Sequence, residues 1–399
     1  MEKDQKDMIS EIIEAFEKYA GHQAFVINNI TYTYRHLSET VYKISTLINN
    51  REDKIIGIIA EDRLETYASI LAVLISGKTY VILHPAYPRH RNRKIAELAD
   101  IHLILYTKDI RVLNLDTEHI DFICTSELQE VVPSSSGIHS EKNENAYIIF
   151  TSGSTGEPKG VPISRNNLNA FYNAYSHLDW QLDENDRMLQ MFELTFDVSI
   201  VSFLFPLTIG ACIYTVSPEG VKYINVIEIL EKYNLTFAAV APSLLQLLLP
   251  YFSEIQLPEL KYLIVTAEAS DVELLSAFRA CSGIPVAIGE TGELWISGRQ
   301  VMNGYWNAPE KTKECLIEGT DGRTYYKTGD LCQIDTDGDI IYCGRKDSQI
   351  KLQGFRIELS EIEHVVKKYF NNECKAVVIP KYGANNQCEL HLVVEKVHR

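Results

Sequence analysis

Residues 146–168 read AYIIFTSGSTGEPKGVPISRNNL and are the most informative segment of the chain. An apolar run typical of a buried strand, AYIIF, leads into the loop TSGSTGEPKG at 151–160. Glycines let the backbone approach an anion closely, hydroxyl and N–H groups donate to phosphate oxygens, and Lys159 adds a positive charge. The loop therefore predicts a phosphate-binding site.

This loop differs from the phosphate loop that opens a helix. In the template G-x-x-x-x-G-K-[ST] a second glycine stands five positions after the first, whereas Pro158 stands five positions after Gly153. Pro158 and Pro162 also prevent a helix from starting directly after the loop. A flexible Ser/Gly surface loop is the alternative interpretation, and the particular order of residues argues against it.

Apolar runs alternate with helical stretches along most of the chain. KIIGIIA, KTYVIL and IHLILY flank helices expected near 64–76 and 89–99, and the rhythm resumes at ACIYTV, TFAAVAP and KYLIVTAE. This alternation predicts an α/β fold, with helices on the faces of buried sheets. AFVINNITYTY predicts a hairpin that turns at Asn28-Asn29. Beyond about residue 290, short runs between Gly and Asp turns predict antiparallel strands.

Composition excludes several classes of protein. With 399 residues, 46% of them hydrophobic, the chain is long enough for more than one domain. A net charge of −16 argues against partners that need a basic face, namely nucleic acid and anionic membranes, and favours a small-molecule substrate. The sequence shows no secretion signal and no apolar run of about 18 residues. Its eight cysteines form no C-x-x-C pair, so we expect reduced thiols in a cytoplasmic protein, without a zinc site.

Taken together, the motifs resemble those of the AMP-forming adenylating enzymes. That family includes nonribosomal peptide synthetase adenylation domains, D-alanine:carrier protein ligases, acyl-CoA synthetases and luciferases, and TSGSTGEPKG is similar to its phosphate loop. Five further segments occur in the family's order: ISGKTYVILHPAYPRHR (75–91), TFDVS (195–199), GELWISGRQVMNGYWN (292–307), YKTGDL (326–331) and GRKDSQIKLQGFRIELSEIE (344–363).

The resemblance implies a site for ATP and Mg²⁺, with no protein residue assigned as a metal ligand. The nucleotide-binding residues that it implies are Thr151, Ser152, Gly153, Ser154, Thr155, Gly156, Lys159, Ala267, Glu268, Asp330 and Arg345. Among them, Lys159 and Thr155 are the expected catalytic residues. Asp330 would bind the ribose, because a carboxylate offers acceptors to two neighbouring hydroxyls. A plain turn residue is the alternative interpretation for Asp330.

The resemblance also implies an amino-acid substrate. Asp197 in TFDVS matches the aspartate that pairs with the substrate's α-ammonium in amino-acid-activating relatives. The alternative is an internal Lys or Arg partner, or a helix cap, because a buried unpaired carboxylate would be costly. Five small or medium apolar residues would approach the substrate side chain and favour a small or aliphatic amino acid; otherwise they are core positions. They are Val198, Val201, Ala239, Val265 and Ala267.

In such enzymes the substrate carboxylate attacks the α-phosphorus of ATP, which gives an acyl-adenylate and pyrophosphate. The acyl group then passes to a thiol, either the phosphopantetheine of a carrier protein or coenzyme A. The implied domains are a large adenylation core of packed sheets with flanking helices, 1–346, and a small, incomplete α+β lobe, 347–399. Asp347 would be the hinge between them; an ordinary exposed turn is the alternative. Acyl-CoA or aryl-acid ligation, and a non-catalytic nucleotide-binding role, remain alternative functions.

Two family segments have no counterpart here. The aromatic-Gly-x-Thr-Glu motif is missing where FRACSG (278–283) runs into IPVAIGETGEL (284–294), a gap of roughly forty residues that is large for a core element. The late segment that carries a lysine near the reacting carboxylate is missing after VVEKVHR. Either the chain joins segments of a longer protein, which its well-formed motifs favour, or it is a deletion that has lost adenylation.

Overall fold

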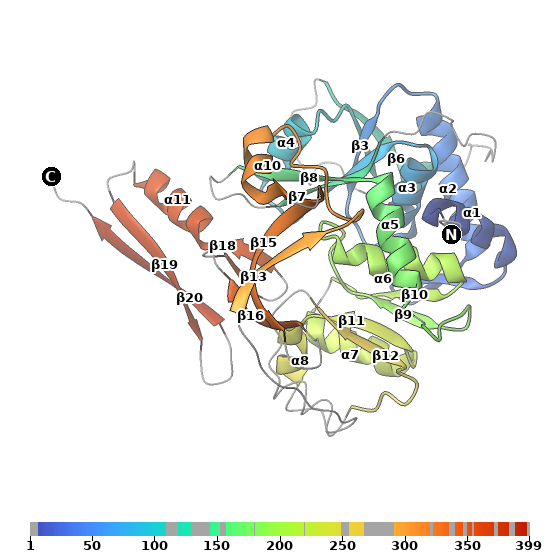
Figure 1. The fold of residues 1–399 in the computed structure, drawn as a ribbon. Coiled ribbons are helices and arrows are strands. Elements are labelled where there is room, and N and C mark those ends of the chain that lie inside the picture. The colour runs from blue at the N-terminus through green and yellow to red at the C-terminus, as the bar shows by residue number, and fades with distance from the viewer. Residues whose placement is uncertain are drawn as a thin grey trace.

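Two mixed six-stranded sheets form the larger part of the fold (Figure 1). The structure is a computed structural model. It describes residues 7–108, 119–128, 144–151, 157–178, 180–218, 220–248, 255–266, 291–319, 322–334, 340–345, 349–352, 355–370, 374–382 and 388–396.

The first sheet carries the segment that opened the sequence analysis. Its strands are parallel except for the last pair, in which β8 returns antiparallel to β7 at the sheet edge. An edge is where a strand tolerates proline, and Pro162 lies in β8. The strand order is β6 (Asp121–Cys124), β5 (Leu103–Tyr106), β3 (Ile55–Ile59), β4 (Thr79–Leu83), β7 (Asn145–Thr151), β8 (Lys159–Ser164).

The second sheet is parallel apart from the hairpin β1–β2 at one edge. Asn28 and Asn29 turn this hairpin with φ of 50° and 62°, the left-handed values that a two-residue turn requires, so the predicted hairpin is confirmed. The strand order is β12 (Tyr262–Val265), β11 (Phe237–Val240), β9 (Arg187–Gln190), β10 (Cys212–Thr215), β1 (Gln23–Ile27), β2 (Ile30–Thr33).

Two nearly fully buried helices join the sheets. Helix α3 (Leu64–Ile75) packs on β3 and β4, and α6 (Val198–Ile209) packs on β9 and β10. Both consist mainly of apolar residues that are distributed around the helix, as expected for helices that contact protein on most sides. An aromatic row connects them, because the ring of Tyr67 lies 4.7 Å from that of Phe25 and 5.5 Å from that of Phe203. Each such buried side chain stabilises the fold by about 1.5–3 kcal/mol.

The remaining helices of these layers cover the sheets from outside or pack beside α3 and α6. Helix α6 ends at Gly210, whose φ is 85°. A side chain at this position would place its Cβ 2.6 Å from the ring of Tyr19, the residue that follows α1. Only glycine fits this end of the helix. These helices are α1 (Met8–Lys18), α2 (Tyr34–Asn49), α4 (Arg89–Leu98), the 3-10 turn η2 (Thr125–Glu127), α5 (Arg165–Ser176), α7 (Lys222–Lys232) and α8 (Pro242–Leu248).

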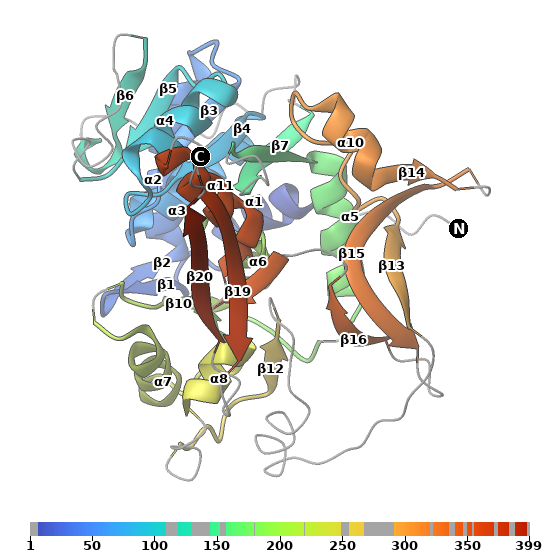
Figure 2. The same cartoon turned by 90° about the vertical axis from the view of Figure 1, so that its left-hand side faces the viewer.

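A four-stranded antiparallel sheet follows, as the sequence predicted for the region beyond about residue 290. In Figure 2 its long strand β15 curves alongside β13, close to α5 and α10. Its elements are β13 (Thr291–Ser297), α10 (Pro309–Cys315), β14 (Leu316–Glu318), β15 (Thr324–Ile334) and β16 (Ile340–Arg345).

The C-terminal elements consist of two hairpins and one helix, and in Figure 1 the hairpin of β19 and β20 projects at the left of the molecule. They are β17 (Gln349–Leu352), β18 (Phe355–Glu358), α11 (Leu359–Tyr369), β19 (Cys374–Tyr382) and β20 (Cys388–Lys396). The expected α/β class with a small α+β unit is therefore confirmed. The boundary at 346/347 and the hinge at Asp347 lie outside the described residues and stay predictions.

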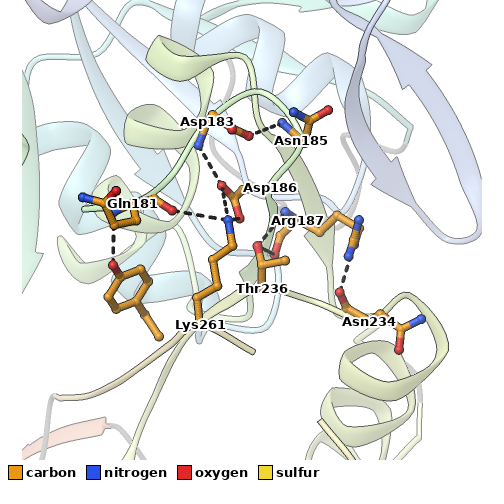
Figure 3. A network of polar contacts seen from close by, with 9 residues as sticks. Gln181, Asp183, Asn185, Asp186, Arg187, Asn234, Thr236 and Lys261 are labelled. Atoms are coloured by element: carbon orange, nitrogen blue, oxygen red, sulfur yellow. Dashed lines mark hydrogen bonds and ion pairs between the residues drawn. The ribbon is translucent and has the colours of Figure 1, made fainter. Parts of the chain in front are cut away.

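A polar network holds the segment before β9 against the start of β12 (Figure 3). Asp186 is only 1% exposed, and its carboxylate lies 2.8 Å from the Lys261 ammonium. It also accepts a hydrogen bond from the backbone N–H of Asp183 at 2.7 Å. Arg187 ties the start of β9 to the carbonyl of Asn234 at 2.9 Å. These contacts connect the residues around the start of β9 to Asn234 and to Lys261.

Replacing Lys261 by methionine is expected to lower the free energy of unfolding by about 1–3 kcal/mol, because the Asp186 carboxylate stays buried without its cation. Lys261 is 45% exposed, so water compensates in part and the lower end of that range is expected. Urea denaturation measures the change. Lys368→Met, at an exposed position of α11, is the control, and an equal effect of both substitutions would contradict the prediction.

Within the described residues, no helix combines the length and the apolar content that a membrane crossing requires. The same part of the chain contains free thiols at Cys124, Cys212, Cys315, Cys332, Cys343 and Cys374.

Candidate active site

A cavity of about 750 Å³ lies where the two six-stranded sheets, the antiparallel sheet and the C-terminal elements approach one another; we call it the central cavity. Strands β7 and β8 provide one apolar wall, with Tyr147, Ile149, Val161 and Ile163. The volume suits a ligand of nucleotide size or larger.

The predicted phosphate loop joins two strands that face this cavity. Thr151 at the end of β7 and Lys159 at the start of β8 are cross-strand partners, and both line the cavity. The chain continues as a strand after the loop, and α5 begins only at Arg165, so the prediction that no helix follows directly is confirmed. The Lys159 ammonium lies 5.9 Å from the ring centre of Tyr305. Ser152, Gly153, Ser154, Thr155 and Gly156 lie outside the described residues.

Asp197 reaches the same cavity from the N-terminus of α6. It occupies the N-cap position, but its side chain makes no capping hydrogen bond. Within the described part of the chain we find no hydrogen-bond donor or cation paired with its carboxylate, so neither internal alternative accounts for it there. Asp197 is exposed to the cavity, so the cost of a buried carboxylate does not arise. Burial raises the pKa of the Tyr147 hydroxyl, and the charges of Tyr80 and Asp197 add to this shift.

A second wall comes from the segment before α4. The Tyr87 hydroxyl donates to Thr195 Oγ1 at 3.1 Å, which connects this segment to the residues before α6. The guanidinium of Arg91 lies 5.2 Å from the ring centre of Tyr87. Tyr87, Arg91 and Thr195 all line the central cavity, so a second cationic group besides Lys159 faces it.

The C-terminal elements close the cavity with carboxylates. Ile357 and Glu358 at the end of β18, and Glu361 in the first turn of α11, belong to its lining. Burial raises the pKa of the Glu361 carboxyl; the positive charge of Arg91 opposes this shift and the negative charge of Glu358 adds to it. The lining of the cavity therefore contains carboxylates as well as the Lys159 ammonium.

Asp330 and Arg345 face each other across β15 and β16. Arg345 Nη1 lies 2.6 Å from Asp330 Oδ1, a charge-assisted hydrogen bond. The two side chains are not in the lining of the central cavity, although Tyr326, on the same strand as Asp330, is. The structure thus pairs the two residues with each other and places them beside the cavity, not in its wall.

The residues expected to contact the substrate side chain are also absent from the cavity lining. Val198 and Val201 are half-buried on α6, Ala239 is buried in the core on β11, and Val265 is half-buried on β12. Their placement agrees with the alternative that they are core positions, and a role in substrate recognition stays a prediction. Ala267 and Glu268 lie outside the described residues.

Several lining residues were not singled out from the sequence. Tyr87 and Arg91 belong to the segment AYPRHR, Tyr305 to NGYWN, and Glu358 and Glu361 to RIELSEIE, so the motifs contained them without indicating their direction. Side-chain direction here depends on how distant elements pack, which the spacing of residues within one motif does not encode.

Comparison with known proteins supplies the family. The model that describes AMP-binding enzymes matches residues 13–289. The chain belongs to the AMP-binding enzyme family. It is 27% identical to tyrocidine synthase 1 of Brevibacillus parabrevis, over 92% of this chain and 38% of the relative. It is 28% identical to bacitracin synthase 1 of Bacillus licheniformis, over 93% of this chain and 8% of the relative.

Two solved structures show how widely this fold is shared. The Vibrio cholerae adenylation domain AlmE, in complex with glycyl-adenosine-5'-phosphate, has a TM-score of 0.84 at 23% identity and covers 97% of this chain and 88% of that one. PA1221, a nonribosomal peptide synthetase protein with adenylation and carrier (PCP) domains, has a TM-score of 0.82 at 18% identity, with coverages of 97% and 76%. The expected membership of the AMP-forming adenylating superfamily is confirmed.

The relatives also contain residues that this family member lacks. The alignment with tyrocidine synthase 1 runs over 432 residues, more than the 399 of the whole chain. The relative therefore has residues without a counterpart in this chain. The chain spans a small part of the length of the curated relatives it matches, 38% and 8% for the two named above.

Proposed function

We propose that the protein uses ATP to adenylate the carboxylate of an amino acid, which releases pyrophosphate. The observation that supports this most is that a cation and an anion line the same cavity. Lys159 on β8 is the cation, and Asp197 is the anion, whose carboxylate has no partner among the described residues. Lys159 suits the phosphates and Asp197 suits an α-ammonium group. A fatty or aryl acid would offer nothing to Asp197.

In the proposed reaction a carboxylate oxygen of the substrate forms a bond to the α-phosphorus. The bond between that phosphorus and the oxygen bridging to the β-phosphate breaks, and pyrophosphate leaves with the electron pair. Positioning and cationic stabilisation supply most of the catalysis of such a transfer. Lys159 would stabilise the growing negative charge, and Thr151, with Thr155 of the loop, would donate hydrogen bonds to phosphate oxygens.

The described residues fit the nucleotide's phosphates through Thr151 and Lys159. They contain no group of three or more His, Cys, Asp and Glu side chains arranged to hold a metal ion, so Mg²⁺ would enter with the phosphates of ATP. The ion would neutralise part of the phosphate charge. The carboxylates of Glu358 and Glu361 would otherwise repel the phosphates. Asp330 lies outside the lining of the central cavity, so the ribose would have to extend beyond that lining to reach it. Its Oδ2 would then accept from a ribose hydroxyl, while Oδ1 accepts from Arg345.

A second half-reaction would transfer the aminoacyl group to the phosphopantetheine thiol of a carrier protein. PA1221 contains adenylation and PCP domains in one protein, which supports this partner, and coenzyme A is the alternative acceptor. A small lobe from residue 347 onward would rotate about Asp347 between the two half-reactions. The carboxylates of Glu358 and Glu361 would move with it.

ATP–pyrophosphate exchange with a panel of amino acids, fatty acids and aryl acids tests the proposal. We expect one small or aliphatic amino acid to stimulate exchange well above the rate without acid. Stimulation by a fatty or aryl acid alone would favour the acyl-CoA or aryl-acid ligase. Binding of ATP without exchange for any acid would favour a non-catalytic nucleotide-binding protein, as the missing family segments allow.

A further inference from the structure

Asn167 joins two distant parts of the site. It is the third residue of α5 and is 5% exposed. Its Oδ1 accepts hydrogen bonds from the N–H and the hydroxyl of Ser164, at 3.0 and 2.6 Å, and this closes a capping box at the start of the helix. Its Nδ2 points away from the helix and donates to the carbonyls of Arg299 and Val301, at 2.6 and 2.9 Å.

These contacts use both lone pairs of the amide oxygen and both hydrogens of the amide nitrogen. They also determine the orientation of the amide, because the helix side offers donors and the carbonyl side offers acceptors. An aspartate would keep the acceptor half and lose the donor half. The two functions of Asn167 are therefore separable by one isosteric substitution.

The amide nitrogen of Asn167 holds the segment of residues 298–306, GRQVMNGYW, which we call the wall loop. Gln300, Val301, Met302 and Tyr305 of the wall loop line the central cavity. The distal end of the loop is anchored separately, since the N–H of Trp306 donates to the carbonyl of Gly160 at 2.8 Å. That carbonyl is next to Lys159 in the sequence, and the Tyr305 ring faces the Lys159 ammonium.

Open space borders the near end of the wall loop, which directly follows β13. A second hollow of about 490 Å³ lies against it, lined by Asn167, Gly298, Arg299, Val301 and Met302. Val301 and Met302 thus face open space on two sides, because they line the central cavity as well. A loop with space on both sides depends on its hydrogen bonds for its position.

We propose that Asn167 is a positioning residue that fixes the wall loop opposite Lys159 and so orders the phosphate end of the central cavity. The consequence for catalysis rests on the proposed function. Asp197 reaches the cavity from α6, and the wall loop does not position α6. Loss of the anchor should therefore weaken the binding of ATP and leave the binding of the amino acid unchanged.

Two variants of Asn167 and one control test this inference. Asn167→Asp keeps the capping acceptor and loses both donors, and Asn167→Ala loses the donors and the capping acceptor without adding charge. Ser164→Ala is the control, because it removes the hydroxyl of the capping box but leaves the bonds to Arg299 and Val301. In both Asn167 variants we expect the KM for ATP to rise about tenfold, with the KM for the amino acid unchanged. In Ser164→Ala we expect a lower Tm and unchanged KM values.

Limited trypsin digestion gives a readout that needs no catalysis. The bond after Arg299 is the one whose carbonyl Asn167 holds, so its cleavage, followed by mass spectrometry, is expected to accelerate several-fold in the Asn167 variants and not in Ser164→Ala. Unchanged cleavage in Asn167→Asp, or equal acceleration in Ser164→Ala, would contradict the inference that Asn167 holds the wall loop. If Asn167→Asp does not fold, Asn167→Ala decides; if neither folds while Ser164→Ala does, the role is structural and the inference fails. If the unaltered protein shows no exchange with any acid, the proposed function fails and the cleavage comparison still decides the anchor.

Discussion

Replacing Lys159 by alanine is expected to lower amino-acid-dependent ATP–pyrophosphate exchange by about 10²–10³-fold. A cation close to a developing phosphate charge is worth about 3–4 kcal/mol when water is largely excluded. Lys159 is held at the start of β8, with its partner Thr151 opposite it and Tyr305 facing it, so its ammonium is placed before any ligand binds. Exchange rates at saturating amino acid and ATP measure the effect.

The control for this substitution is Lys313→Ala. Lys313 lies on α10, is 72% exposed and pairs with Glu310 at 2.9 Å, and it does not line the central cavity. We expect its exchange rate to stay within about twofold of the unaltered protein, since exposed pairs contribute little. Asp330→Ala should lower exchange strongly through loss of the ribose contact. Near-unchanged rates in both Lys159→Ala and Asp330→Ala would contradict the nucleotide-site assignment.

Replacing Asp197 by asparagine is expected to raise the KM for the amino acid by about 10²-fold or more and to leave the KM for ATP unchanged. Asparagine keeps the shape of the side chain and removes its charge. Asp197 is exposed in the open cavity, and a bound amino acid would shield the charge pair from water. Loss of one member of such a shielded pair costs about 3–5 kcal/mol, because the substrate's ammonium group would then enter the cavity without an anion. Initial exchange rates over a range of amino-acid and ATP concentrations separate the two constants.

A substrate analogue sharpens this test. The acid that lacks the α-amino group should be a poor substrate for the unaltered protein and should lose nothing further in Asp197→Asn. Glu184→Gln, an exposed position outside the cavity, is the matched control for removing a negative charge. An equal rise in KM for both substrates, or none for the amino acid, would contradict the assignment of Asp197 to the ammonium group.

The C-terminal elements add a charge arrangement that bears on both tests. Glu358 and Glu361 face the same cavity as Lys159 and Arg91. Anionic phosphates are favoured near the cations and disfavoured near the carboxylates, so the position of α11 affects how the proposed nucleotide is held. In the proposed cycle, the lobe that carries α11 would have to keep Glu358 and Glu361 away from the phosphates of ATP before pyrophosphate forms.

Local patterns were enough to predict most of the fold. The alternation of apolar runs and helical stretches predicted β3, α3, β4, α4 and β5 in order, because strand and helix periodicity are properties of neighbouring residues. Asn28-Asn29 predicted its hairpin for the same reason, since the turn depends on two residues that tolerate positive φ. Pro158 and Pro162 correctly excluded a helix directly after the loop.

Site residues were predictable only where a motif carries its own chemistry. Thr151, Lys159 and Asp197 were named from their motifs, and the fold brings all three to one cavity. Val198 and Ala239 were named by their place in a pattern, and the fold turns them toward the core or away from the cavity. The direction of an apolar side chain depends on which neighbours exclude it from water, and those neighbours are distant in sequence.

Sequence by itself therefore predicted most of the elements, the phosphate-binding role proposed for residues 151–160 and the resemblance to AMP-forming enzymes, because each depends on residues close together in the chain. Only the tertiary structure decided that Asp330 pairs with Arg345 beside the cavity, and that Glu358 and Glu361 close it. It alone showed that Asn167 holds Arg299 and Val301, more than 130 residues further along. Contacts of this kind arise when packed sheets bring distant backbone groups within hydrogen-bonding distance, and no local pattern records that approach.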